Sequence, residues 1–376
     1  MTWDCLQIKA PGKLFIAGEY AVLEPYQSSV VIAVDRYILA KIEKNEENSI
    51  ALPDLGVGQT AWRYADGTAV FSPSDERFRF VGSAIETSLR YLQEHQINLK
   101  TFRLTITSEL DDPSGRKYGL GSSAAVVVAV VSAILHFHGS AVKLSRSLLF
   151  KLAAIAHLRA QGNGSGADVA AAVFGGWIKY ASFQADWLLR RIRQTEHLTT
   201  IIDEPWPFLA VDELYPIPDL HVCVGWTGQP ASTSGLIKQV QAIRETSPEM
   251  YQEFLQSSMT AVKELTAAFA KSEVAPALAG IARNRAALKK LGDLAQAMIE
   301  TPELTELCRL AEKYNGAGKP SGAGGGDCGI ALIAGEANAE RLRAAWRQAG
   351  ITPLRLNVDF QGVAVSEQSA FGMKLV

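Results

Sequence analysis

The pattern of apolar and polar positions predicts a chain in which strands and helices alternate. Short apolar runs at residues 14–17 and 29–34, followed by a partial alternation at 37–42, indicate several strands within residues 6–44. Apolar residues then recur at helical spacing over residues 79–95, and residues 102–106 again have a strand pattern. This mixture predicts an α+β fold.

The apolar run at residues 124–135 is ambiguous, because it is rich in valine and valine favours strands by propensity alone. Its length and its Gly-Ser-Ser start favour instead a helix that is buried on most sides. Two more helices fit residues 145–160 and 166–173, and a strand fits residues 177–180. The first half of the chain therefore combines strands with several helices.

The regular pattern weakens between about residues 184 and 220, where Pro205, Pro207, Pro216 and Pro218 accumulate. After this segment we expect a strand at 221–225, long helices through about residue 314, a strand at 329–334, a helix at 337–349 and terminal strands. Because 376 residues exceed the size of one ordinary core, two domains are predicted, at residues 1–215 and 216–376.

Composition and charge limit the kinds of molecule that the chain is expected to bind. The net charge is -2, so the chain lacks the basic field on which binding to nucleic acids and anionic membranes depends. Its first residues lack the basic and apolar blocks of a secretory signal, and its longest apolar run is too short to span a bilayer. We therefore expect a cytoplasmic protein in which local cations hold any anionic substrate. The four cysteines have no paired or metal-ligand spacing and are expected to be reduced.

Three glycine-rich segments lie far apart in the chain, at residues 10–13, 119–125 and 321–327. Glycine removes side chains where a backbone must come close to another group, and the middle segment runs directly into the predicted helix. Backbone N–H groups at the start of a helix bind phosphate. Together the three segments favour an enzyme of phosphoryl transfer.

The middle segment fits a triphosphate on local grounds. Its glycines let backbone N–H groups face outward, Ser122 or Ser123 can cap the helix, and the helix dipole adds partial positive charge. The alternative is a capped buried helix whose glycines serve only a tight turn. The segment is not a Walker loop, because no Gly-Lys-Ser/Thr follows the glycines, and it lacks the Gly-x-Gly-x-x-Gly order of a Rossmann loop.

Two charged residues beside the glycine-rich segments are candidates for a reaction centre. Ser165 and Asp168 follow the Ser-x-x-Asp pattern of a helix cap, but the Asp168 carboxylate could also orient a nucleophile or its proton. Lys13 could be an ordinary lysine at a strand end, or a cation that stabilises charge on a transferred phosphoryl group. Asp168 could be the ion-pair partner of Lys13.

With these motifs in this order, the chain resembles the GHMP kinases over about residues 6–366. The resemblance implies an N-terminal α/β domain, a C-terminal ferredoxin-like domain, and ATP and substrate bound in the cleft between them. Within the family, the chain is more similar to bacterial phosphomevalonate kinases. Mevalonate kinases usually have His where Tyr20 stands and Pro where Gly164 stands, and the segment at residues 321–329 is also closer to the phosphomevalonate branch.

The resemblance also implies roles for individual residues. Lys13 and Asp168 become the reaction-centre pair, Lys117 a phosphate-binding cation and Ser123 a contact of Mg²⁺. Mevalonate kinases carry a metal-binding Glu eleven residues before the aspartate, where this chain has His157, so the protein ligands of Mg²⁺ stay open. The residues implied to contact ATP are Lys117, Gly119, Leu120, Gly121, Ser122, Ser123, Ala124 and Ala125. Those implied to contact the acceptor are Lys13, Tyr20, Ser165, Asp168, Ser321, Gly322 and Ala323.

The implied activity is Mg²⁺-dependent transfer of the ATP γ-phosphoryl group to the phosphate of (R)-5-phosphomevalonate, in the mevalonate route to isoprenoids. Two alternatives stay open. The chain could phosphorylate an alcohol such as mevalonate or the substrate of another small-molecule GHMP kinase, or it could be a relative that binds ligand without catalysis. We expect neither nucleic acid nor a membrane as a partner, and either a monomer or a homodimer.

Overall fold

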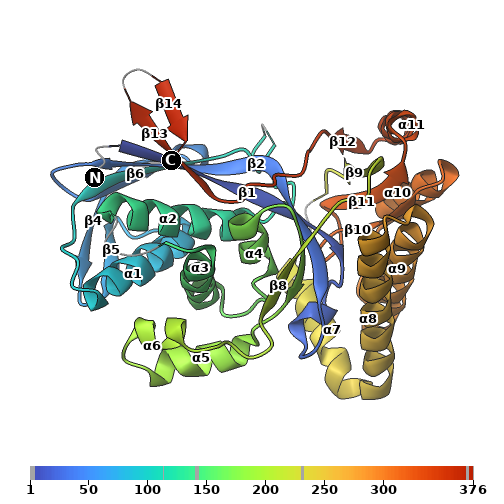
Figure 1. The fold of residues 1–376 in the computed structure, drawn as a ribbon, viewed down its shortest axis with the longest axis horizontal. Coiled ribbons are helices and arrows are strands. Elements are labelled where there is room, and N and C mark those ends of the chain that lie inside the picture. The colour runs from blue at the N-terminus through green and yellow to red at the C-terminus, as the bar shows by residue number, and fades with distance from the viewer. Residues whose placement is uncertain (1–4, 113, 140–143, 230–232, 370–371, 376) are drawn as a thin grey trace.

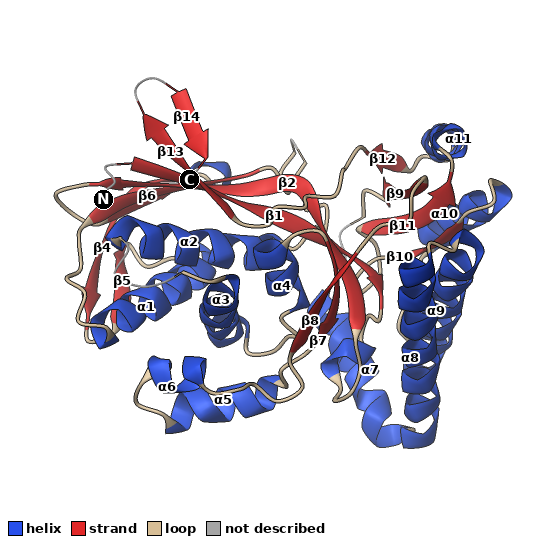
Figure 2. Ribbon diagram, viewed as in Figure 1, coloured by secondary structure: helices blue, strands red, loops and turns tan. Residues whose placement is uncertain are grey.

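The computed structural model describes residues 5–112, 114–139, 144–229, 233–369 and 372–375. They form two sheets with helices packed against each (Figures 1 and 2). The strands of the larger sheet are β1 (Cys5–Ala17), β2 (Ser29–Lys44), β3 (Ser49–Leu52), β4 (Val57–Ala65), β5 (Thr68–Ser72), β6 (Phe102–Ser108), β7 (Trp177–Ala181), β8 (Ala210–Leu214), β13 (Ala364–Ser369) and β14 (Gly372–Leu375). Their order is β14-β13-β1-β2-β6-β3-β4-β5, with β7 paired to β2 and β8 to β7.

Strands β1 and β2 form the centre of the larger sheet and confirm the strands predicted within residues 6–44. They pair antiparallel along nearly their whole length, with a register shift between Pro11 and Gly12. Proline has no N–H to donate to a β-ladder, so an irregularity at this point follows from the sequence. The shift lies directly before Lys13, in the part of β1 that faces the glycine-rich segment at residues 119–125.

Helices α1 (Arg79–Glu94), α2 (Ser122–His138), α3 (Arg146–Gln161) and α4 (Ala167–Phe174) lie on one face of this sheet (Figure 1). The helix predicted for the valine-rich run is confirmed as α2. It packs against β1 and β2 on one side and against α1 and α3 on the other, so nearly all of its side chains are buried. This burial on most sides outweighs the strand propensity of valine.

The segment from residue 184 to residue 220 is more regular than its sequence pattern predicts. It contains α5 (Ala185–Gln194), α6 (Leu198–Asp203) and strand β8. Side chains from distant helices hold both ends of α6. The Glu94 carboxylate accepts from the N–H groups of Leu198 and Thr199 at 2.8 Å each, and Lys151 donates to the carbonyl of Ile202 at 2.5 Å. These partners complement the helix dipole, and local sequence gives no sign of them.

The smaller sheet has the order β10-β11-β9-β12. Its strands are β9 (Leu220–Trp226), β10 (Ala317–Pro320), β11 (Cys328–Ala334) and β12 (Thr352–Leu354). The helices are α7 (Thr233–Thr246), α8 (Pro248–Lys271), α9 (Val274–Ala295), α10 (Pro302–Lys313) and α11 (Glu336–Gln348). Short 3-10 turns lie at Ala21–Leu23, Pro53–Leu55 and Glu76–Phe78. Of these helices, α9, α10 and α11 pack against the sheet, while α7 and α8 pack against α9. The long helices predicted through about residue 314 are thus present.

The chain returns to the larger sheet after β12. Strand β13 pairs antiparallel with β1, and β14 pairs with β13. The division into domains at residues 1–215 and 216–376 stays a prediction, and the terminal strands belong in space to the first sheet. Among the described residues, no helix is both long and apolar enough to cross a membrane.

Candidate active site

The start of helix α2 leaves backbone donors without a cap. Gly121 precedes the helix with a φ of 81°, and no side chain caps the first turn. The expectation that Ser122 or Ser123 caps this helix was therefore wrong, because a glycine in the left-handed region takes the cap position. The N–H groups of Ser122, Ser123 and Ala124 have no acceptor within the helix, since the first bond of the helix is made by Ala125.

Lys13 lies directly against this helix start. Its ammonium donates to the carbonyl of Gly119 at 3.0 Å, and its backbone N–H donates to the carbonyl of Leu120 at 2.8 Å. A Cβ atom at Gly121 would lie 3.0 Å from Cγ of Lys13, so glycine at this position leaves room for the lysine side chain. The first and second glycine-rich segments thus meet through Lys13.

The third glycine-rich segment reaches the same place. A Cβ atom at Gly119 would lie 2.7 Å from both Cβ and Oδ2 of Asp327, and the thiol of Cys328 donates to the carbonyl of Tyr118 at 3.0 Å. The backbone of Asp327 is held in turn by Thr227, whose N–H donates to its carbonyl at 2.9 Å. The structure therefore brings together all three segments, which lie more than a hundred residues apart in the sequence.

Asp168 lies in the first turn of α4, beside Lys13 but not bonded to it. The helix begins at Ala167, and the Asp168 carboxylate accepts from the N–H of Val169 at 3.0 Å. The Ser165 hydroxyl accepts from the N–H of Ala167 at 3.3 Å, so the Ser-x-x-Asp segment does not form the cap that its spacing suggests. Within the described residues, Lys13 bonds to Gly119 and forms no ion pair with Asp168.

Lys13 nevertheless interacts electrostatically with the carboxylates around it. Burial lowers the pKa of Lys13 from its ordinary value, and the carboxylates of Asp168 and Asp327 oppose that shift. Near Asp168, burial raises the pKa of Tyr180, and the negative charge of Asp168 adds to the effect. The Tyr180 hydroxyl donates to the carbonyl of Ser165 at 2.6 Å, which fixes the loop that leads into α4.

Ser123, the residue implied to contact Mg²⁺, lies 3.2 Å through its hydroxyl oxygen from Nε2 of His157. His157 is buried and stacks on the ring of Phe80, with the ring centroids 5.4 Å apart. In the tautomer whose Nε2 carries no proton, the Ser123 hydroxyl donates to His157 and keeps its lone pairs for another partner. The position where mevalonate kinases carry an acid thus contacts Ser123 directly.

The other predicted residues are spread around this centre. Lys117 is exposed and makes no side-chain hydrogen bond or ion pair among the described residues. Leu120, Ala124 and Ala125 are buried in the core, so their predicted contacts with ATP stay predictions. Gly322 has open space within 4 Å of where a Cβ atom would stand.

Hydrogen bonds connect the segment of Ser321 and Ala323 to the segment of Phe15 and Tyr20. The Tyr20 hydroxyl donates to the carbonyl of Ala323 at 2.5 Å, and the Ser321 hydroxyl bonds to the backbone of Phe15. Their predicted roles as contacts of the acceptor stay predictions. What they do here is to join the third glycine-rich segment to β1 and the turn that follows it.

Sequence reasoning missed one prominent feature of this region, the buried ion pair of Glu19 and Lys319. Glu19 is 2% exposed and Lys319 is completely buried. No pattern in the sequence marks this pair, because the burial of Lys319 on β10 is seen only in the structure. Once that burial is known, a charged partner is expected, since a fully buried lysine needs one.

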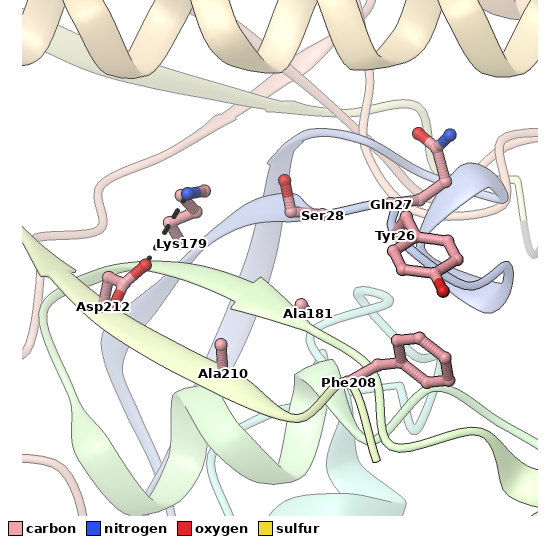
Figure 3. A pocket seen from close by; sticks show the side chains of 8 residues that line it. All are labelled: Tyr26, Gln27, Ser28, Lys179, Ala181, Phe208, Ala210 and Asp212. Carbon is pink, nitrogen blue, oxygen red and sulfur yellow. Dashed lines mark ion pairs between the residues drawn. The ribbon is translucent and has the colours of Figure 1, made fainter.

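A cavity of about 210 Å³ lies elsewhere, between the start of β2 and strands β7 and β8 (Figure 3). Tyr26 and Phe208 meet edge to face beside it, with ring centroids 4.8 Å apart, and Lys179 pairs with Asp212 at 3.6 Å. None of the residues that line it is a predicted site residue. The candidate active site is therefore the meeting point of the three glycine-rich segments.

Comparison with known proteins agrees with this arrangement. Residues 79–176 match the N-terminal domain of the GHMP kinases, and residues 265–352 match their C-terminal domain. A phosphomevalonate kinase from Streptomyces sp. (strain CL190) is 37% identical over 367 residues, covering 94% of this chain and 97% of that protein. A mevalonate kinase from Thermococcus gammatolerans is 27% identical over 366 residues, covering 95% of this chain and 97% of that protein.

Solved structures give the same family. The Streptococcus pneumoniae phosphomevalonate kinase in complex with phosphomevalonate and AMPPNP has a TM-score of 0.82 and 28% identity to this chain. The alignment covers 94% of this chain and 99% of that one. The two-domain α+β fold implied by the sequence motifs is thereby confirmed. With both domains matched in order and a relative that is 37% identical across nearly the whole length, the chain belongs to the GHMP kinase family.

Proposed function

We propose that this chain transfers the γ-phosphoryl group of ATP to the phosphate of (R)-5-phosphomevalonate. Its full-length similarity to a phosphomevalonate kinase supports the acceptor, and a related structure that holds phosphomevalonate and AMPPNP supports both substrates. In this reaction an oxygen of the acceptor phosphate forms a bond to the γ-phosphorus of ATP. The bond between that phosphorus and the oxygen bridging to the β-phosphate breaks, which gives 5-diphosphomevalonate and ADP.

The observation that carries the proposal is the contact between Lys13 and the uncapped start of α2. The Lys13 ammonium lies 3.0 Å from the Gly119 carbonyl oxygen, beside three N–H groups that have no acceptor in the helix. Both features supply fixed positive charge at one place. We infer that the N–H groups hold the phosphates of ATP, and that Lys13 stabilises the charge spread over the transferred group.

A phosphate acceptor changes what the site must do. A phosphate monoester has a second pKa of about 6 and is mostly dianionic at neutral pH, so it needs little deprotonation. The main difficulty is the approach of two polyanions, which fixed cations and alignment relieve. Lys13 and the exposed Lys117 supply such cations. Asp168 then orients Lys13 and the acceptor rather than removing a proton.

The side chains at the start of α2 could supply only a small part of the ligands that Mg²⁺ needs. Among the described residues, no group of three or more His, Cys, Asp or Glu side chains could hold a metal ion. The Ser123 hydroxyl, with its proton directed to His157, would hold the ion together with the phosphates and water, which is common for Mg²⁺. The ion would supply positive charge against the phosphates. His157 would act through Ser123, because Mg²⁺ prefers oxygen ligands to imidazole.

An Asp168→Asn variant should keep most of its kcat with phosphomevalonate, with a loss below about tenfold. A general base typically contributes 10²- to 10⁴-fold, and a dianionic acceptor does not need one. The measurement is steady-state ADP release at saturating substrates. Near-complete loss of turnover in a folded variant would contradict this role and indicate that Asp168 acts as a general base.

At subsaturating substrate, kcat/KM should also fall on the alkaline side at a lower pH than an ordinary lysine would give. Burial lowers the pKa of Lys13 in the free protein, so its ammonium loses its proton sooner as the pH rises, and kcat/KM, which reports the free enzyme, falls through that lowered pKa. A Lys13→Arg variant keeps its charge throughout this range, so any activity it retains should lose this alkaline limb. An unchanged limb in that variant would show that another group titrates.

The assignment of the acceptor is tested by coupled ADP release with Mg-ATP and, in parallel, phosphomevalonate, mevalonate or no acceptor. We expect turnover with phosphomevalonate alone. Turnover with mevalonate in its place would move the chain to the alcohol kinases, for which the 27% identical mevalonate kinase is the precedent. Nucleotide binding without turnover on any acceptor would make the chain a non-catalytic relative.

A further inference from the structure

The buried ion pair of Glu19 and Lys319 joins two parts of the chain that lie 300 residues apart. Glu19 is in the turn after β1, and Lys319 is on β10 of the smaller sheet. The Lys319 ammonium contacts Oε1 of Glu19 and also donates to the carbonyl of Pro320 at 2.5 Å. The other carboxylate oxygen, Oε2, is buried without a hydrogen-bond partner in the described part of the chain.

A buried ion pair of this kind adds little to the stability of the fold by itself. Removing two charges from water costs several kcal/mol for each ion, and apolar side chains of similar volume often stabilise a fold as well or better. A buried pair does fix geometry, because each charge loses its compensation if the two segments move apart. Its place between two glycine-rich segments therefore suggests a role in their relative position.

Two hydrogen-bond contacts flank the ion pair and connect the same two segments. The Ser321 hydroxyl donates to the carbonyl of Phe15 at 2.9 Å and accepts from the Phe15 N–H at 3.0 Å, as a neighbouring strand would. The Tyr20 hydroxyl donates to the carbonyl of Ala323 at 2.5 Å. Residues 319, 321 and 323 thus each contact β1 or the turn that follows it.

These contacts lie next to Lys13 along β1. Phe15 is two residues after Lys13, so the two side chains share a face of the strand, and the Lys13 ammonium lies 5.7 Å from the centroid of the Phe15 ring. At its other end, the third glycine-rich segment places Asp327 against Gly119, whose carbonyl accepts from Lys13. A shift of this segment along β1 would therefore change the surroundings of Lys13 on two sides.

We propose that Glu19 and Lys319 are positioning residues for phosphoryl transfer, which hold the third glycine-rich segment against the strand that carries Lys13. This inference rests on the proposed function of the site. The ion pair acts at a distance from the reacting atoms, through Ser321 and Phe15 on one side and through Tyr20 and Ala323 on the other. A small displacement of such a support can cost about 10²-fold in rate without removing any group that touches substrate.

The test separates position from stability with three variants, Glu19→Gln, Lys319→Met and the double variant. Each single change leaves one buried charge unpaired, so we expect a lower melting temperature and a kcat reduced by roughly 10- to 100-fold. The double change leaves no unpaired charge. We expect its melting temperature to recover toward that of the wild type. Its kcat should stay as low as in the single variant that loses less activity, and KM for ATP should change less than about threefold.

A control away from the site is the pair of Arg191 and Glu204, which join at 2.8 Å between α5 and the end of α6. Its double variant, Arg191→Met with Glu204→Gln, should leave kcat within about twofold, whatever its effect on the melting temperature. All variants are assayed with the acceptor that supports wild-type turnover, so a wrong assignment of the acceptor does not affect the comparison. The inference is overturned if kcat recovers together with stability in the Glu19/Lys319 double variant, or if neither single change lowers kcat.

Discussion

Replacing Lys13 by methionine should lower kcat by ~10²-fold or more, which corresponds to about 2.7 kcal/mol of lost transition-state stabilisation. Methionine keeps the length and apolar stem of the side chain but removes the ammonium beside Gly119. The phosphoryl group in transfer spreads negative charge over its oxygens, and a fixed cation is worth most where water is excluded. We expect KM for ATP to change much less than kcat.

The matched control for this variant is Lys9→Met. Lys9 lies on the same strand β1, but its ammonium contacts the ring of Tyr37, 4.8 Å from the centroid, and not the glycine-rich segments. We expect this variant to keep its kcat within about twofold. Rate and thermal unfolding are measured for both proteins. A folded Lys13→Met variant with nearly wild-type kcat would contradict the placement of Lys13 at the reaction centre.

Gly119→Ala should have the second large effect, a loss of about 10²-fold or more in kcat/KM for ATP. A Cβ atom at residue 119 would lie 2.7 Å from Cβ of Asp327, whose backbone is held by Thr227. The φ of 81° adds a conformational cost of about 1–2 kcal/mol. Either residue 119 or Asp327 must move, and the Gly119 carbonyl that accepts from Lys13 would move with it.

Gly115→Ala separates the steric effect from the backbone effect. Gly115 lies in the same loop and has the same φ of 81°, but nothing lies within 4 Å of where its Cβ atom would stand. Both variants therefore carry a similar conformational cost, and only Gly119→Ala adds the collision with Asp327. We expect at most a few-fold change in kcat/KM for Gly115→Ala. Equal losses in the two variants would argue that loop conformation, and not the contact between segments, sets the activity.

The glycine-rich segments were the part of the site that the sequence predicted best. Their composition indicated close backbone approach, and Gly119 and Gly121 are in fact where Asp327 and Lys13 come nearest to the loop. The helical type of α1 also followed from apolar spacing. In α2, length and the glycine-serine start predicted a helix correctly against the strand propensity of valine.

Interactions between distant segments were what the sequence did not predict. Helix α6 depends on Glu94 and Lys151 from other helices, and β13 pairs with β1 although more than 340 residues separate them. The serine cap expected for α2 failed because Gly121 takes the cap position in a left-handed conformation. The partnership of Glu19 and Lys319 likewise exists only once the two sheets come together.

We propose above all that the acceptor of the phosphoryl group is itself a phosphate. The most direct measurement is ³¹P NMR of the product formed from Mg-ATP and phosphomevalonate by the wild-type protein. We expect the acceptor monoester resonance to disappear and two mutually coupled diphosphate resonances, separate from those of ADP, to replace it in step with the formation of ADP. An unchanged phosphomevalonate resonance, together with a new monoester resonance when mevalonate is supplied, would contradict it.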